Sequence, residues 1–281
     1  MHDLDLPAYF RRIGHAGTAA TPDLATLVEL IALHRTTIAF ENIDGLAGRV
    51  PRLDLASLQA KLVGQRRGGW CFEQNHLFRA VLQRLGYVVD GLEGRVRIGV
   101  AADGADTARS HMVLRVTLDE VAWLVDVGLG GPSPLAPMAQ GDRREQRVNG
   151  EPYRIVDACN GGEPALTLQG LTDGEWRDIY LVHTRVASPI DYDVANWYVA
   201  TNPSAALKTN LVVSRPRRDG TRFGLRNDRL TTRRPGGTSD VRLLANRAEI
   251  ADALADLFGL DVADADLTAV MAVVERATAA S

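Results

Sequence analysis

The sequence of 281 residues contains only two cysteines, Cys71 and Cys159. Two thiols cannot build the disulfide framework of a small secreted scaffold, which favours a reducing compartment. The sequence also lacks any run near the ~18 apolar residues that a membrane-spanning helix needs. Its first stretch, MHDLDLPAYFRRIG, lacks the apolar core of a signal peptide. We therefore expect a soluble, cytoplasmic protein.

The sequence also has no large excess of positive or negative charge. Lysine and arginine number 32 against 35 aspartate and glutamate residues, which gives a formal net charge of −3. Such a balance gives no reason to expect nucleic acid or an anionic membrane as a partner. The hydrophobic share of 46% is that of an ordinary globular protein. The chain length suggests two or three packed subdomains.

The first third of the sequence has the periodicity of amphipathic helices. Thr21, followed by proline, predicts a helix start, because its hydroxyl can cap the first turn and proline fits the first helical position. A second helix is expected over residues 55–63, with Asp54 as its N-terminal cap. A third is expected to begin at Cys71 and to stop at Gly86, a residue suited to a left-handed C-terminal cap.

After Gly86 the hydrophobic pattern changes from helical to alternating. Strands are expected within residues 87–100, 110–118 and 121–129. Further short strands continue to Val182, a connecting segment with a short helix covers residues 189–203, and more strands precede a helical tail from Asn246. Helices, a β-rich middle and a small α/β end predict the α+β fold class.

Cys71 is the most informative single residue. It follows Gly68 and Gly69, which permit a tight approach turn, and it stands where a helix is predicted to begin. Unpaired N–H groups and the helix dipole stabilise a thiolate at such a position. Most free cysteines are nevertheless buried and unreactive, and this stretch alone slightly favours a buried, unreactive Cys71.

A predicted hairpin supplies a base and a carboxylate. If Leu118 pairs with Val121 across the turn, His111 and Asp126 become diagonal neighbours on one face of the sheet. Diagonal positions lie roughly 7–8 Å apart, within reach of a histidine–carboxylate hydrogen bond. The turn is not of the Asn-Gly type, and a three-residue loop would break this register.

These three residues together form a nucleophile, a base and an orienting group. His111 can accept the thiol proton of Cys71, while Asp126 fixes the histidine tautomer and stabilises the imidazolium. Considered alone, His111 could equally be a strand histidine with ordinary hydrogen-bond partners. Asp126 alone could equally be a turn carboxylate that precedes a glycine. The combination favours covalent catalysis by a cysteine.

At this point the sequence resembles the arylamine N-acetyltransferase family. Five elements carry the resemblance and occur in the family's order: Phe40–Asn42 (FEN), Arg67–Asn75 (RGGxCxExN), Ser110–Leu114, Asp126–Gly131 and Asn196–Pro203 (NxxxxTxP). The cysteine signature is specific, and the likeness in length and element order extends over nearly the whole chain.

The resemblance implies a three-part fold with a papain-like catalytic core. The parts are a helical bundle over residues 1–86, a β-barrel-like domain over 87–190, and a connecting segment with an α/β lid over 191–281. The implied triad is Cys71, His111 and Asp126. Arg67 and Glu41 would form a supporting ion pair beneath the cysteine loop.

The resemblance also implies the reaction. Acetyl would pass from acetyl-CoA through a cysteine thioester to the nitrogen of arylamines, arylhydrazines or N-arylhydroxylamines, with no metal or prosthetic group and with monomer and homo-oligomer both open. Backbone N–H groups near Cys71 would hold the developing oxyanion. The residues expected to contact CoA are Thr107, Ala108, Gly130, Gly131, Tyr198 and Ser204.

Some positions depart from the family pattern. Leu129 replaces the aromatic residue that usually follows the glycine, and Ala205 and Leu207 replace a usual serine and phenylalanine after the later element. These positions border the donor and acceptor cleft in relatives. Donor length and aryl preference are therefore open.

Other interpretations use the same residues. A related amide synthase, or a hydrolase or transglutaminase-like enzyme, would share the triad and use a different acyl donor or acceptor. A non-enzymatic binding module would keep Cys71 buried and inert. A zinc site from Cys71, His76 and His111 is disfavoured, because residues five apart on a helix point roughly 140° from each other and no CxxC or HxxxH pair is present.

Overall fold

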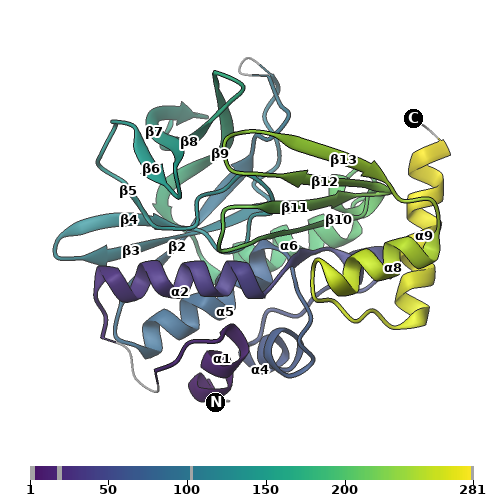
Figure 1. Cartoon of the computed structure of the whole chain (residues 1–281). Coiled ribbons are helices and arrows are strands. Elements are labelled where there is room, and N and C mark those ends of the chain that lie inside the picture. Colours follow the sequence, from purple (N-terminus) through teal and green to yellow (C-terminus); the bar gives the residue numbers. More distant parts are fainter. Residues whose placement is uncertain (1–3, 18–20, 102–103, 280–281) are drawn as a thin grey trace.

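The computed structural model describes residues 4–17, 21–101 and 104–279. It combines helices with two antiparallel sheets, one of eight strands and one of five (Figure 1). The N-terminal helices lie along one side of the eight-stranded sheet, and the C-terminal helices α8 and α9 flank the five-stranded one. This is the predicted α+β class. In the part of the chain described, no helix has both the length and the apolar character to traverse a bilayer.

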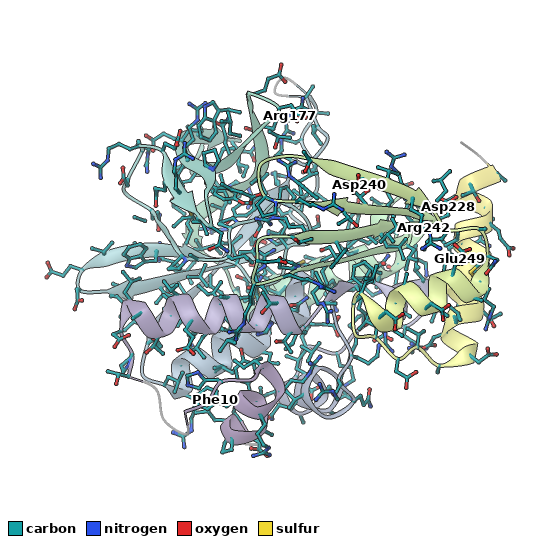
Figure 2. All side chains as sticks on the ribbon, in the orientation of Figure 1. Phe10, Arg177, Asp228, Asp240, Arg242 and Glu249 are labelled. Carbon is teal, nitrogen blue, oxygen red and sulfur yellow. The ribbon has the colours of Figure 1, made fainter. Side chains whose placement is uncertain are left out.

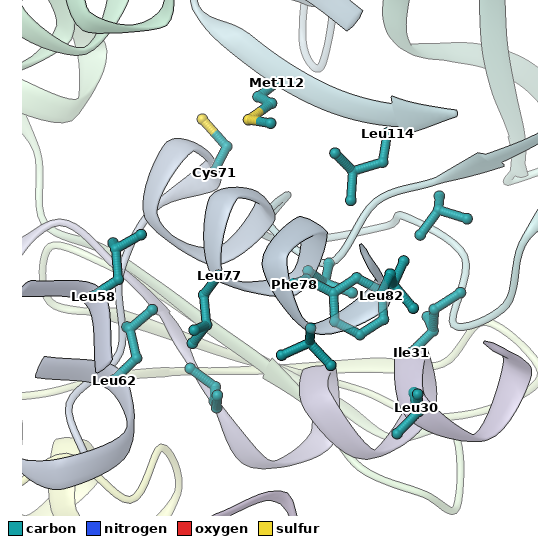
Figure 3. Packing of buried hydrophobic residues seen from close by; sticks show 14 of the residues in the cluster. Leu30, Ile31, Leu58, Leu62, Cys71, Leu77, Phe78, Leu82, Met112 and Leu114 are labelled. Carbon is teal, nitrogen blue, oxygen red and sulfur yellow. The ribbon is translucent and has the colours of Figure 1, made fainter. Parts of the chain in front are cut away.

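Within residues 4–17 and 21–87, five helices and one π-helical segment precede the first long strand. They are α1 (Leu6–Ile13), α2 (Leu24–Thr37), α3 (Ile43–Leu46), α4 (Leu55–Leu58), η1 (Gln59–Gly64) and α5 (Cys71–Arg84). Leu30 and Ile31 of α2 and Phe78 and Leu82 of α5 belong to one buried cluster (Figure 3). Each such side chain contributes roughly 1.5–3 kcal/mol through burial. The cluster therefore fixes α5, which begins with Cys71, against α2.

The helix boundaries confirm two predictions and correct one. Helix α5 begins at Cys71 as predicted, and Gly86 just beyond it has the expected left-handed φ of 95°. Asp54 caps the second helix, accepting a hydrogen bond from the backbone N–H three residues on, although that helix loosens into a π-helix. The predicted start at Thr21 is wrong. Asp23 caps α2 instead, because its carboxylate accepts the Thr26 N–H at 2.8 Å.

The eight-stranded sheet curves into a barrel-like shape. Its strands are β2 (Val88–Val96), β3 (His111–Leu118), β4 (Val121–Val125), β5 (Met138–Ala139), β6 (Gln146–Val148), β7 (Glu151–Asn160), β8 (Glu163–Thr172) and β9 (Glu175–Val186), in the spatial order β5-β4-β3-β2-β9-β8-β7-β6. Its interior holds a second apolar cluster that includes Leu92, Val113 and Leu168. Helix α5 packs against β2 and β3, which brings the start of α5 to the strand that carries His111.

The five-stranded sheet joins distant parts of the chain. It comprises β1 (Phe40–Glu41), β10 (Val212–Pro216), β11 (Arg222–Arg226), β12 (Arg229–Arg233) and β13 (Ser239–Leu243), connected by α6 (Pro189–Thr201) and α7 (Ala206–Thr209) and followed by α8 (Arg247–Asp256) and α9 (Asp264–Ala279). Arg242 of β13 and Glu249 of α8 form an ion pair at 2.7 Å (Figure 2). Because β1 pairs with β10, this sheet is anchored next to the cysteine loop. The division at residues 86 and 190 stays a prediction.

Candidate active site

Cys71 occupies the first position of α5. The Glu73 carboxylate accepts the backbone N–H of Trp70 at 3.1 Å, which caps the helix start. The Trp70 indole in turn donates to Asn196 at 2.9 Å, so the later sequence element holds the cysteine loop. The Cys71 side chain is 5% exposed and points from the helix toward the strand that carries Met112 (Figure 3). Its sulfur lies 3.6 Å from the carbonyl of Ser110.

The hairpin β3–β4 has the predicted register. Leu118 pairs with Val121, and the pairing continues outward to the end of β4. The two turn residues, Asp119 and Glu120, both have positive φ, 47° and 64°, which closes a two-residue turn matched to the strand twist. As a result the Nε2 atom of His111 lies 2.8 Å from Oδ2 of Asp126. The predicted contact is present.

The electrostatics of this pair favour its charged form. Burial lowers the pKa of His111, but the charge of Asp126, its hydrogen bond and the nearby Cys71 sulfur raise that pKa overall. Burial likewise raises the pKa of Asp126, and His111 then lowers it below its usual value. The Nδ1 atom of His111 has no hydrogen-bond partner among the residues described. The ring of Tyr180 packs against the imidazole at 5.4 Å.

Asn75 holds the aspartate in place. Its amide donates to Oδ1 of Asp126 at 3.0 Å and to the carbonyl of Met112 at 2.8 Å, while its oxygen accepts the Val127 N–H at 3.1 Å. Asn75 belongs to the cysteine motif, but the sequence pattern predicted no role for it. The signal was available, because positions four apart on a helix share a face, so Asn75 lies on the same side of α5 as Cys71.

The position of Gly128, two residues after Asp126, has no room for a side chain. A Cβ atom there would lie 2.6 Å from the Cα of Cys71 and 2.7 Å from the amide nitrogen of Asn75. Only glycine permits this close approach. The Gly128 N–H also donates to Oδ1 of Asp126 at 2.8 Å. The segment after β4 therefore runs directly against the start of α5.

A buried charge cluster lies beneath the cysteine loop. The predicted ion pair between Arg67 and Glu41 is present at 2.8 Å, with both side chains largely buried. Lys61 extends it, pairing with Glu73 at 2.7 Å and Asp44 at 2.6 Å. Burial raises the pKa of Glu73 to about 7, although Lys61 opposes the shift. This extension was not predicted from the sequence, because Asp44, Lys61 and Glu73 come from separate elements with no common spacing.

A cleft of about 440 Å³ lies between the barrel-like sheet and the five-stranded sheet. Residues from both sheets and the intervening loops line it, among them Ile98, Gly131, Tyr153, Ser214, Arg222 and Phe223. Gly131 is the one predicted CoA contact among its lining residues, and its N–H donates to the Ser214 hydroxyl at 3.1 Å. Gly130 lies beside the same hydroxyl. Cys71, His111 and Asp126 are not among the lining residues.

The other predicted CoA contacts lie elsewhere. The Thr107 hydroxyl donates to the carbonyl of Val96 at 2.8 Å, and the Ala108 carbonyl accepts the Ser110 N–H at 2.8 Å, so both belong to the segment entering β3. Tyr198 is 39% exposed on α6, and Ser204 is exposed in the turn that follows. Among residues 4–17, 21–101 and 104–279, no group of three or more His, Cys, Asp or Glu side chains is placed to hold a metal ion.

Comparison with known proteins identifies the family. A family model described as N-acetyltransferase matches residues 23–267. The arylamine N-acetyltransferase of Mycobacterium tuberculosis H37Rv is 39% identical over 265 residues, covering 93% of this chain and 91% of the relative. The chain belongs to the arylamine N-acetyltransferase family. As a member of this family it is an acyltransferase.

Solved structures of arylamine N-acetyltransferases share the fold. The Mycobacterium marinum enzyme superposes with a TM-score of 0.90 at 36% identity, covering 97% of this chain and 99% of that one. Its complex with CoA gives a TM-score of 0.88, with the same identity and coverage. The Salmonella typhimurium enzyme gives 0.87 at 30% identity, covering 96% and 99%. The likeness thus extends over the whole architecture and not only the cysteine motif.

Proposed function

We propose that this chain transfers acetyl from acetyl-CoA, through a thioester on Cys71, to the nitrogen of an arylamine, arylhydrazine or N-arylhydroxylamine. Family membership and the CoA complex of the M. marinum relative support the donor. The observation that carries the proposal is the 2.8 Å contact between His111 and Asp126, beside a cysteine at a helix start.

The first half-reaction consumes the donor. His111 Nδ1, the ring nitrogen opposite the Asp126 contact, takes the proton from Cys71, and the thiolate attacks the acetyl carbonyl carbon. The carbon–sulfur bond to CoA then breaks, and the imidazolium returns the proton to the departing CoA sulfur. The products are acetyl-Cys71 and CoA with its thiol restored. Exchange of one thioester for another keeps this step nearly balanced.

The second half-reaction consumes the acceptor. The amine nitrogen attacks the acetyl carbon of the thioester, and His111 accepts the proton that this nitrogen loses. The carbon–sulfur bond to Cys71 breaks, the sulfur takes the proton back, and the N-acetyl product leaves. In both steps the oxyanion forms next to the first turn of α5, whose unpaired N–H groups are suited to hold it.

The donor contacts are proposals of the same kind. Gly131 lines the cleft, and Gly130 precedes it in the chain, so both would contact CoA there, whereas Thr107, Ala108, Tyr198 and Ser204 would contact CoA outside the cleft. Residues 191–281 would then act as a lid, since β10 and β11 form one wall of the cleft. Leu129 is buried in the barrel interior.

Initial-rate kinetics test the function. With acetyl-CoA and a hydrazine acceptor varied together, a ping-pong enzyme gives parallel lines in a double-reciprocal plot. Release of CoA that needs no acceptor and continues past one equivalent would instead indicate the hydrolase alternative. A screen of longer acyl-CoA donors against the same acceptor separates the amide-synthase alternative, which would prefer another acyl group.

A further inference from the structure

Arg35 of α2 is a buried cation held only by neutral oxygens. It is 3% exposed, and its guanidinium donates to the carbonyls of Leu129 at 2.9 Å, Ser133 at 2.8 Å and Pro134 at 2.6 Å, and to the Ser133 hydroxyl at 2.9 Å. It makes no ion pair with any residue that the structure describes. Burial lowers the pKa of Arg35 to about 10, so the guanidinium stays charged at neutral pH.

The segment that Arg35 holds directly follows Gly128, one of the residues that position Asp126. The Gly128 N–H donates to the Asp126 carboxylate, and a Cβ atom at this position would lie 2.6 Å from the Cα of Cys71. Arg222 of β11 donates to the same Ser133 carbonyl at 2.9 Å, but its charge is neutralised by an ion pair with Glu151. Arg35 is therefore the uncompensated cation on this segment.

Stability alone does not explain such a residue. Removing a charge from water costs several kcal/mol, and apolar residues of similar volume are often as stabilising. The negative group that acts most on Arg35 is Asp126. Conversely, burial raises the pKa of Asp126 while His111, Asn75 and then Arg35 lower it.

We propose that Arg35 is a positioning residue of the acetyl-transfer site: it fixes residues 129–134 behind Asp126 and places a buried positive charge near that carboxylate. The inference rests on the proposed function, because it assigns Arg35 a role through Asp126 and His111. The hydrogen bonds of its guanidinium go to oxygens of Leu129, Ser133 and Pro134, so Arg35 would act through that segment.

A double-mutant cycle tests the coupling. Arg35→Met and Asp126→Asn are made singly and together in a Cys159→Ser background, so that Cys71 is the sole thiol. The readout is the second-order rate constant for alkylation of Cys71 by iodoacetamide near neutral pH. Arg35→Met is expected to slow alkylation roughly tenfold when Asp126 is present and less than about twofold when it is replaced, because groups that act through one another are not additive.

Arg12→Met is the matched control. Arg12 is also buried, 7% exposed, and donates to backbone carbonyls, those of Leu62 at 2.9 Å and Arg66 at 3.0 Å. Arg12→Met should change the alkylation rate by the same factor whether residue 126 is aspartate or asparagine. Arg35→Lys, which keeps the charge with fewer donors, should slow alkylation less than Arg35→Met. If thermal unfolding shows that Arg35→Met is unfolded at the assay temperature, Arg35→Lys takes its place in the cycle.

The outcomes separate this inference from the proposed function. An equal effect of the Arg35 substitution in both backgrounds would make Arg35 purely structural and overturn the inference. If Asp126→Asn alone leaves the alkylation rate unchanged, the triad itself fails, and with it the proposed function.

Discussion

His111 and Asp126 are 15 residues apart in sequence, yet their side chains meet at 2.8 Å in the protein interior. A tight turn and an uninterrupted antiparallel register produce this contact, and Asn75 and Gly128 lock the carboxylate from the other side. The pair is therefore built by short-range structure and stiffened by the helix that begins with Cys71.

Asp126→Asn should leave the protein folded and lower turnover by roughly 10³–10⁴-fold, because the amide cannot stabilise the imidazolium or fix its tautomer. Steady-state rates with acetyl-CoA and an arylamine measure this, with circular dichroism as the check on folding. Near-wild-type turnover would remove Asp126 from the proposed triad.

Asn75→Ala should cost roughly 1–3 kcal/mol in the free energy of unfolding, since it leaves a buried N–H and carbonyl without partners, and should also lower turnover through Asp126. Urea unfolding and initial rates measure the two effects. Gln83→Ala, an exposed amide on the same helix, is the matched control and should change neither. Equal behaviour of the two variants would contradict the role of Asn75.

His34 should make stability fall in acid. Burial lowers the pKa of His34 to about 3, below its usual 6.5. Its contribution to stability is therefore present above pH 6.5 and is lost as pH falls toward 3. The stability deficit of His34→Gln, measured by urea unfolding, should shrink between about pH 7.5 and about pH 4.5.

Tyr9→Phe is the control for that titration. It removes the 2.8 Å hydrogen bond to His34 but keeps the titrating imidazole. Its deficit should stay nearly constant over the same pH range. A deficit of His34→Gln that does not change with pH would show that His34 is not the group whose protonation unfolds the protein.

Glu41→Gln should destabilise the protein by about 3 kcal/mol, because Arg67 loses its closest buried carboxylate and keeps Asp44 and Asp266, each at 3.6 Å. The comparison is Glu175→Gln, which breaks the exposed pair with Arg177 at 3.0 Å and should cost less than about 1 kcal/mol. Thermal unfolding of both variants gives the measurement. Similar costs would mean that the charges beneath the cysteine loop are not effectively buried.

Sequence patterns predicted what depends on local spacing. The helix start at Cys71, the cap at Asp54 and the β3–β4 register all follow from residues close together in the chain. Asp119 and Glu120 both have positive φ although neither is a glycine. The register was predicted from the short separation of the two strand patterns, and the backbone conformation of the turn was not predicted.

The remaining features depend on tertiary packing. No spacing relates Cys71 to His111, so their chemistry and the family resemblance, not a distance in the sequence, predicted that they act together. Arg35 and His34 stand side by side on α2, and both are buried, although polar neighbours at a helix end suggest a solvent face. Charged residues of this kind become informative only when their partners, contributed by distant segments, are known.

The central claim is that Cys71 carries the acetyl group between donor and acceptor. Incubation with acetyl-CoA alone, followed by intact-mass and peptide mass spectrometry, tests it most directly. The account predicts a stoichiometric burst of CoA and one acetyl group on the peptide that contains Cys71, lost again when an arylamine is added. An unmodified Cys71 peptide under conditions where the enzyme turns over would contradict it.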